Sequence, residues 1–135
     1  MIVDTSALLA YFDRKEPDHA TVAAAIETTK EALVVSPYVL AELDYLVATR
    51  HGVDAELAVL AELAGGAWDL ASMSADDALA AHGVIGRYRD QGIGLADASI
   101  VVLAQRHRTR QIVTLDRRHF DLLRPLDGGR FRLLP

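Results

Sequence analysis

The stretch that decides the fold is the opening ten residues, Met1–Ala10, which read MIVDTSALLA. Ile2 and Val3 favour a β-strand, the strand runs directly into Asp4, and an apolar segment of helical character follows. Ligands of open α/β sheets bind outside the carboxyl ends of the strands, so Asp4 is expected at such a binding edge. Thr5 or Ser6 is expected to cap the helix that follows. The alternative at this point is that Asp4 only ends a strand at a turn.

The chain has 135 residues, of which 51% are hydrophobic, and this predicts one domain over residues 1–135 with a well-filled core. The surplus of apolar residues also leaves some apolar surface for a partner. The absence of cysteine excludes disulfides, thiolate catalysis and cysteine-based zinc sites. No apolar run is long enough to cross a membrane, and no signal-peptide pattern opens the chain. We therefore expect a cytoplasmic protein without a membrane partner.

The net charge of −5 argues against a simple nucleic-acid-binding protein, but the charge is unevenly distributed. From Arg106 to the C-terminus, eight arginines oppose three aspartates, so this part carries +5 and the residues before it carry −10. An acidic site that collects cations, with a rim of arginines, suits a polyanionic substrate. For several of these arginines the alternative is an ordinary solvated basic surface.

Expected strands alternate with expected helices along the chain. The strands are expected at residues 2–3, 32–35, 67–70, 111–115 and 131–134, and the helices at 7–13, 19–30, 37–50, 54–64, 75–90 and 95–104. Helix starts are indicated by Ser36 before Pro37 and by Ser74 three residues before Asp77. The alternation predicts an α/β fold in which helices cover both faces of a mostly parallel sheet.

Carboxylates stand at the ends of these elements. Asp4 and Asp116 each follow a β-rich run, and the carboxyl ends of parallel strands share one edge of a sheet. Asp97 stands at a helix N-terminus, where capping alone would explain a carboxylate. Glu42 and Asp44 both flank the apolar face of the helix at 37–50, and their spacing does not choose between them.

Carboxylates gathered on one edge repel one another unless a cation or protons neutralise them. Oxygen ligands without cysteine or paired histidines suit Mg²⁺ or Mn²⁺ rather than zinc. The five histidines, including His107 and His119 in the basic stretch, show no metal-ligand spacing. A carboxylate-held Mg²⁺ beside arginines suits phosphodiester hydrolysis, because the metal activates water and arginine holds phosphate. No P-loop is present, so ATP use is not indicated.

Four segments, in this order and spacing, resemble the PIN-domain ribonucleases and, more narrowly, the VapC toxins of bacterial toxin–antitoxin modules. They are IVDTSALLA at residues 2–10, SPYVLAEL at 36–43, GLADASIVVLA at 94–104 and IVTLDRRHF at 112–120. The resemblance spans nearly the whole chain. It implies a three-layer α/β/α sandwich around a mostly parallel sheet.

The resemblance also implies a set of functional residues. Matched by motif, the catalytic and Mg²⁺-binding acids are Asp4, Glu42, Asp97 and Asp116, with Mn²⁺ as the alternative ion. The match selects Glu42 over Asp44, which it leaves unassigned. Ser6 and Thr114 match hydroxyls that support the acids. Leu115 stands where the family often has Asn, and the motif leaves open whether Asp116 binds the ion directly or through water.

The implied activity is cleavage of RNA, with transfer or ribosomal RNA as the substrate class. Asp4, Glu42 and Asp97 would hold one or two ions, and Asp116 would complete the cluster. A metal-activated water would then attack the phosphodiester in line and leave a 5′-phosphate and a 3′-hydroxyl. From charge, we expect Arg117 and Arg118 to steer the RNA backbone. The family further implies a VapB-like antitoxin that covers the site, and a homodimer.

Two other functions compete with this one. A haloacid-dehalogenase-like phosphatase also has an Asp after its first strand, but its chemistry needs a second Asp two residues later, where this chain has Ser6. A catalytically inert PIN-like binding module is the second alternative. Retention of all four acids argues against it, because a carboxylate cluster without a metal costs stability.

Overall fold

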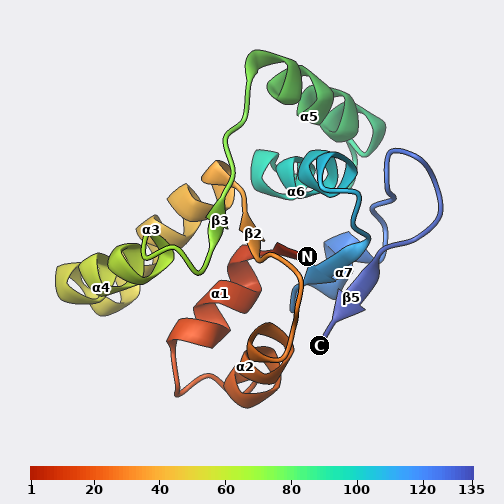
Figure 1. Cartoon of the computed structure of the whole chain (residues 1–135). Coiled ribbons are helices and arrows are strands. Elements are labelled where there is room, and N and C mark those ends of the chain that lie inside the picture. Colours follow the sequence, from red (N-terminus) through yellow and green to blue (C-terminus); the bar gives the residue numbers. More distant parts are fainter.

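The computed structural model describes residues 1–135, which form a five-stranded parallel sheet between layers of helices (Figure 1). The strands are β1 (Ile2–Val3), β2 (Val34–Val35), β3 (Asp69–Leu70), β4 (Gln111–Val113) and β5 (Arg132–Leu134). The helices are α1 (Thr5–Phe12), α2 (His19–Glu27), α3 (Pro37–His51), α4 (Val53–Leu63), α5 (Ala75–Arg87), α6 (Leu95–Arg106) and α7 (Arg117–Phe120). No helix is long and apolar enough to span a membrane.

The sheet has the strand order β3-β2-β1-β4-β5, and every pair is parallel. In Figure 1, α5 and α6 lie above the sheet and α1 and α2 lie below it. Helix α3 contacts both α1 and α6 and so connects the two layers. The fold is therefore the three-layer α/β/α sandwich that the sequence predicted, with a sheet that is wholly rather than mostly parallel.

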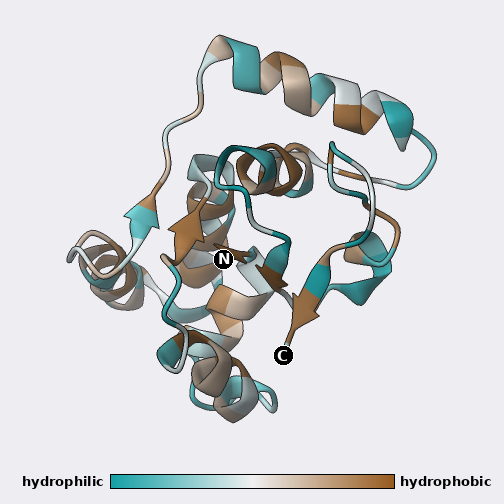
Figure 2. Ribbon diagram, turned by 45° about the vertical axis from the view of Figure 1, so that its right-hand side comes forward, coloured by the Kyte–Doolittle hydropathy of each residue, from teal (hydrophilic) through white to brown (hydrophobic).

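The central strands are almost completely buried because their side chains face helices on both sides. Ile2, Val3, Ile112 and Val113 are each 0% exposed. Helix α6 is apolar around most of its circumference and lies against this part of the sheet. Figure 2 shows apolar residues gathered around the centre of the molecule, whereas hydrophilic and apolar residues alternate along the outer helix α5.

Several elements differ from the sequence expectation: α2, β2, α5 and β4 are each shorter than expected, and α1, β3 and α7 differ more. Helix α1 begins at Thr5 and its N-cap is Asp4, so the expected cap at Thr5 or Ser6 is wrong. The carboxylate of Asp4 itself accepts the backbone N–H of Ser6, at 3.4 Å. Strand β3 has only two residues, and the four-residue helix α7 follows Asp116 where no helix was expected. Four residues are too few to show a helical periodicity in sequence.

A buried pair of hydroxyl groups joins the start of α3 to α6. Ser36 caps α3 by accepting the backbone N–H of Tyr38, at 3.1 Å, as predicted from the Ser36–Pro37 pair. Its hydroxyl also lies 2.6 Å from the Ser99 hydroxyl of α6. Because Ser99 donates its proton to the carbonyl of Ala96, the proton between the two hydroxyls comes from Ser36. This bond fixes the helix that carries Glu42 against the helix that carries Asp97.

Replacing Ser36 with Ala should lower the free energy of unfolding by about 1–3 kcal/mol, because a helix cap and a buried hydrogen bond are lost together. The matched variant is Ser74→Ala, which removes the exposed capping box of α5 and should cost about 1 kcal/mol. Urea unfolding of both variants measures the difference. A Ser36 variant no less stable than the Ser74 variant would contradict this role.

Candidate active site

The site is built around the carboxylate of Asp4, which is 4% exposed and lies between β1 and α1. Its Oδ2 atom accepts the hydroxyl of Ser6 at 2.7 Å and the hydroxyl of Thr114 at 2.8 Å. The two hydroxyl oxygens are 3.3 Å apart, and each donates its proton to Asp4. Asp4 is thus connected directly to the segment that follows β4, and the two hydroxyls expected to support the acids, Ser6 and Thr114, both contact it.

The same two hydroxyls fix the chain beyond β4. Ser6 Oγ accepts the backbone N–H of Leu115 at 2.9 Å, and Thr114 Oγ1 accepts that of Asp116 at 3.0 Å. Each hydroxyl therefore donates to Asp4 and accepts from the segment that carries the next acid. This arrangement sets the position of Asp116 relative to Asp4.

Asp97 and Asp116 meet on either side of a histidine. His119 Nδ1 lies 3.1 Å from Asp97 Oδ2 and 3.2 Å from Asp116 Oδ2. Asp116 is also the N-cap of α7 and accepts the backbone N–H of His119 at 3.2 Å. The short helix therefore presents an imidazole between two carboxylates. In the sequence His119 shows no metal-ligand spacing and belongs only to the basic stretch, because its two partners are brought to it by the tertiary structure.

Glu42 joins the site through Thr5, the residue that follows Asp4. Thr5 Oγ1 donates to Glu42 Oε2 at 2.8 Å across α1 and α3. Asp44 faces a different neighbour: Glu56 of α4 lies against it, and this contact raises the pKa of Glu56. Asp44 Oδ1 is buried without a hydrogen-bond partner. The structure thus separates the two acids of α3 that spacing left equivalent, and places Glu42 on the side of Asp4.

The acids influence one another electrostatically. Burial raises the pKa of Asp4 above its usual 3.8, and the donors from Ser6 and Thr114 oppose that shift only in part. Burial, followed by repulsion from Asp4 and Asp116, raises the pKa of Asp97 to about 6, against the opposing effect of His119. Burial alone accounts for the shift of Asp4, whereas burial together with repulsion from the two neighbouring carboxylates accounts for that of Asp97. The three aspartates therefore form one electrostatic cluster.

The donor set of this cluster suits a hard divalent cation, because it consists of carboxylate oxygens without a thiolate. A cation would also relieve the repulsion that raises the pKa of Asp97. In the present arrangement, however, no three His, Asp or Glu side chains form a ready set of ligands. Asp97 and Asp116 are turned toward His119 instead. The residues fit the ion by charge and chemistry, and cation binding requires their side chains to reorient.

The arginines are divided between two ends of the molecule. Arg117 and Arg118 follow Asp116 directly in α7 and are exposed, so they lie at the acidic end. Arg117 donates to the carbonyl oxygen of Pro135 at 3.0 Å. Arg110 and Arg132 instead lie at the starts of β4 and β5, on the opposite edge of the sheet. The expectation of an arginine-rich rim around the acids thus applies only to the arginines of α7.

Comparison with known proteins agrees with this geometry. The PIN domain family matches residues 1–124. Ribonuclease VapC26 of Mycobacterium tuberculosis (strain ATCC 25618 / H37Rv) is 66% identical over 135 residues, which cover 100% of both chains.

Two solved structures share the fold. The crystal structure of M. tuberculosis VapC20, described as a Sarcin-Ricin loop cleaving toxin, has a TM-score of 0.79 at 21% identity and covers 86% of this chain and 89% of that one. A toxin–antitoxin complex from Klebsiella pneumoniae has a TM-score of 0.68 at 21% identity and covers 88% of each chain. At this identity the two structures show the fold alone. Taken with the family match and the full-length relative, they show that this chain belongs to the PIN-domain family and, within it, to the VapC ribonucleases.

Proposed function

We propose that this protein is a Mg²⁺-dependent endoribonuclease toxin of a type II toxin–antitoxin system. The observation that carries the proposal is the electrostatic cluster in which Asp4 and Asp116, which follow the parallel strands β1 and β4, meet Asp97 from the first turn of α6. Glu42 reaches the same edge through Thr5. The relative that is 66% identical bears the name ribonuclease, which supports RNA as the substrate.

Each residue of the cluster has a distinct part in this proposal. Asp4 is the most rigid ligand, because two hydroxyls fix one of its oxygens. Glu42, Asp97 and Asp116 complete the ligand set, and His119 holds the last two carboxylates together in the absence of the ion. Mg²⁺, when bound, supplies the Lewis acid that activates water and offsets charge on the scissile phosphate. Mn²⁺ is the alternative ion.

Arg117 and Arg118 are proposed to contact the RNA backbone near the cut. Both are exposed and adjoin Asp116, and guanidinium groups bind phosphate oxygens in a bidentate manner. The substrate class remains transfer or ribosomal RNA, as the family resemblance implies. The phosphatase alternative finds no support, because the Ser6 hydroxyl, bonded to Asp4, fills the place of its second acid.

A VapB-like antitoxin is the proposed partner, by analogy with the complex from Klebsiella pneumoniae. A hollow of about 460 Å³ lies between α1, α2 and α4, and its lining includes Tyr11, Phe12 and Val59. Aromatic and aliphatic side chains of this kind are typical of the centre of a protein interface. The homodimer implied by the family stays a prediction, which light scattering of the purified protein checks.

The two acids of α3 provide a matched test of the site. Glu42→Gln and Asp4→Asn should each lower Mg²⁺-dependent RNA cleavage at least about 100-fold, because each removes a carboxylate from the cation site. Asp44→Asn should retain activity, since Asp44 faces α4 rather than Asp4.

Cleavage is followed on total cellular RNA, with sequencing of the new ends and with EDTA as the metal-free control. Activity that persists in EDTA, or in Asp4→Asn, would overturn the proposal. A wild-type protein that cleaves no RNA but still binds an antitoxin would favour the inert binding module.

The raised pKa of Asp97 predicts a pH-dependent stability. Because the folded-state pKa of about 6 lies above the usual 3.8, the folded protein binds the proton more tightly than the unfolded chain does. Stability without metal should therefore fall as the pH rises from about 4 to 6 and then level off. Asp97→Asn removes this penalty and should be more stable at pH 7.5 by of order 1–3 kcal/mol.

Urea unfolding at pH 4 and pH 7.5 in EDTA measures this difference, which should be small at pH 4. Added Mg²⁺ should stabilise the wild type and not the variant, because only the wild type retains the full ligand set. Equal stability of both proteins at pH 7.5 in EDTA would show that Asp97 is not destabilised by its neighbours.

A further inference from the structure

The amino edge of the sheet, opposite the acids, carries a basic hollow of about 580 Å³. Three arginines contribute to its lining: Arg108 from the turn after α6, Arg110 just before β4, and Arg132 at the start of β5. We call this surface the amino-edge basic surface. Arg132 is held in place by its backbone N–H, which donates to the carbonyl of Arg110 at 2.8 Å. Arg108 and Arg110 are thus two positions apart in the chain, and a backbone hydrogen bond holds Arg132 next to Arg110.

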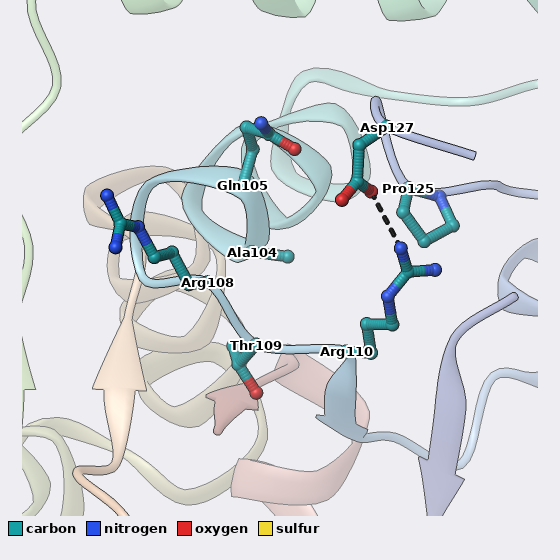
Figure 3. Close-up of a pocket in the computed structure, with 7 residues that line it drawn as sticks. All are labelled: Ala104, Gln105, Arg108, Thr109, Arg110, Pro125 and Asp127. Atoms are coloured by element: carbon teal, nitrogen blue, oxygen red, sulfur yellow. Dashed lines mark hydrogen bonds and ion pairs between the residues drawn. The ribbon is translucent and has the colours of Figure 1, made fainter. Parts of the chain in front are cut away.

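Two of these arginines have no carboxylate partner. The ion pairs at this end use Arg106, with Asp77, and Arg110, with Asp127 at 3.0 Å. Figure 3 shows Arg110 directed toward Asp127, whereas Arg108 extends away from that pair. The one acid that lines the hollow, Glu31, is engaged by the amino group of Met1 at 3.0 Å. The surface therefore has a positive excess in a protein whose net charge is −5.

The backbone at Arg108 ends helix α6. Arg108 has φ +50°, and its N–H donates to the carbonyl of Gln105 at 3.3 Å while the N–H of Thr109 donates to that of Ala104 at 3.0 Å. These two bonds are the usual termination of an α-helix by a residue in the left-handed conformation. The turn leaves the guanidinium of Arg108 exposed and without a hydrogen-bond or ion-pair partner inside the protein.

We propose that the amino-edge basic surface binds the phosphate backbone of a base-paired stem in the same RNA that is cut at the acidic edge. This inference rests on the proposed ribonuclease function. Guanidinium groups recognise phosphates without reading bases. The lining residues of the hollow include no Phe, Tyr or Trp, and their single aromatic ring is the imidazole of His107. Arginines therefore outnumber stacking side chains on this surface, and duplex RNA is recognised through its shape and phosphates. A protein interface would instead present aromatic anchors.

The two edges of the sheet are too far apart for a small substrate to contact both. Asp116 comes six positions after Arg110, which corresponds to about 20 Å of extended chain. A short oligonucleotide centred on the acids does not reach Arg108 and Arg132. A structured RNA that extends past the edge of the sheet reaches both sites, so the basic surface would favour structured over short substrates.

The test compares two double variants with the same change in charge. Arg108→Gln with Arg132→Gln removes the unpaired arginines, and Arg50→Gln with Arg89→Gln removes two exposed arginines elsewhere. Binding is measured by fluorescence anisotropy of a labelled RNA hairpin with a long stem, at several NaCl concentrations, in an Asp4→Asn background. The first pair should weaken binding about 10-fold and lower the salt slope by about 2, because each phosphate contact contributes about 1. The control pair should change binding less than about 2-fold.

Cleavage assays separate this inference from the proposed function. With Asp4 intact, the Arg108 and Arg132 variant should cut a short oligonucleotide spanning the mapped cleavage site as fast as the wild type, and structured RNA more slowly. Arg108→Gly should weaken hairpin binding with an unchanged or higher melting temperature, which excludes misfolding. Equal effects of the two double variants would overturn the inference. A wild type that cuts neither substrate would overturn the ribonuclease function instead, while the hairpin binding still reports on the basic surface.

Discussion

The burial of the Asp4 carboxylate between the hydroxyls of Ser6 and Thr114 is the interaction on which the rest of the site depends. It connects the first strand to the fourth, which are more than a hundred residues apart in sequence. Each hydroxyl donates to Asp4 and accepts a backbone N–H from the segment that leads to Asp116. The part of the site around Asp4 is rigid because both hydroxyl protons are donated to Asp4. A displacement of Asp4 would therefore also displace Asp116, whose backbone is bonded to Thr114.

The carboxylates that suit a cation at this edge of the sheet also destabilise the folded protein. Burial and mutual repulsion raise the pKa of Asp97 to about 6, so the ionised cluster destabilises the metal-free protein. His119 reduces this repulsion from the other side, because its imidazole lies between Asp97 and Asp116. A site of this kind favours a bound cation, because the cation offsets the repulsion among the buried carboxylates.

The distribution of arginines gives the molecule two chemically different edges. Acids occupy the carboxyl ends of the strands, and Arg110 and Arg132 occupy the amino ends of β4 and β5. Asp116 and Arg110 both come from the last third of the chain and lie on either side of the three-residue strand β4. A single parallel sheet therefore holds an acidic edge and a basic edge without mutual neutralisation, because the buried strands separate them.

The sequence by itself determined the alternation of strands and helices, the caps at Ser36 and Ser74, and the presence of Asp4 and Asp116 shortly after β1 and β4. These are local properties, set by hydrophobic periodicity and by hydrogen bonds between near neighbours. Spacing left the two acids of α3 equivalent and the family motif selected Glu42, but only the tertiary structure shows the physical difference, since Thr5 lies opposite Glu42 and Glu56 opposite Asp44. The tertiary structure also decided that His119 joins two distant aspartates, and that Arg110 and Arg132 lie at the edge of the sheet opposite the acids. Partners of this kind are set by the packing of elements far apart in the chain, which no local pattern records.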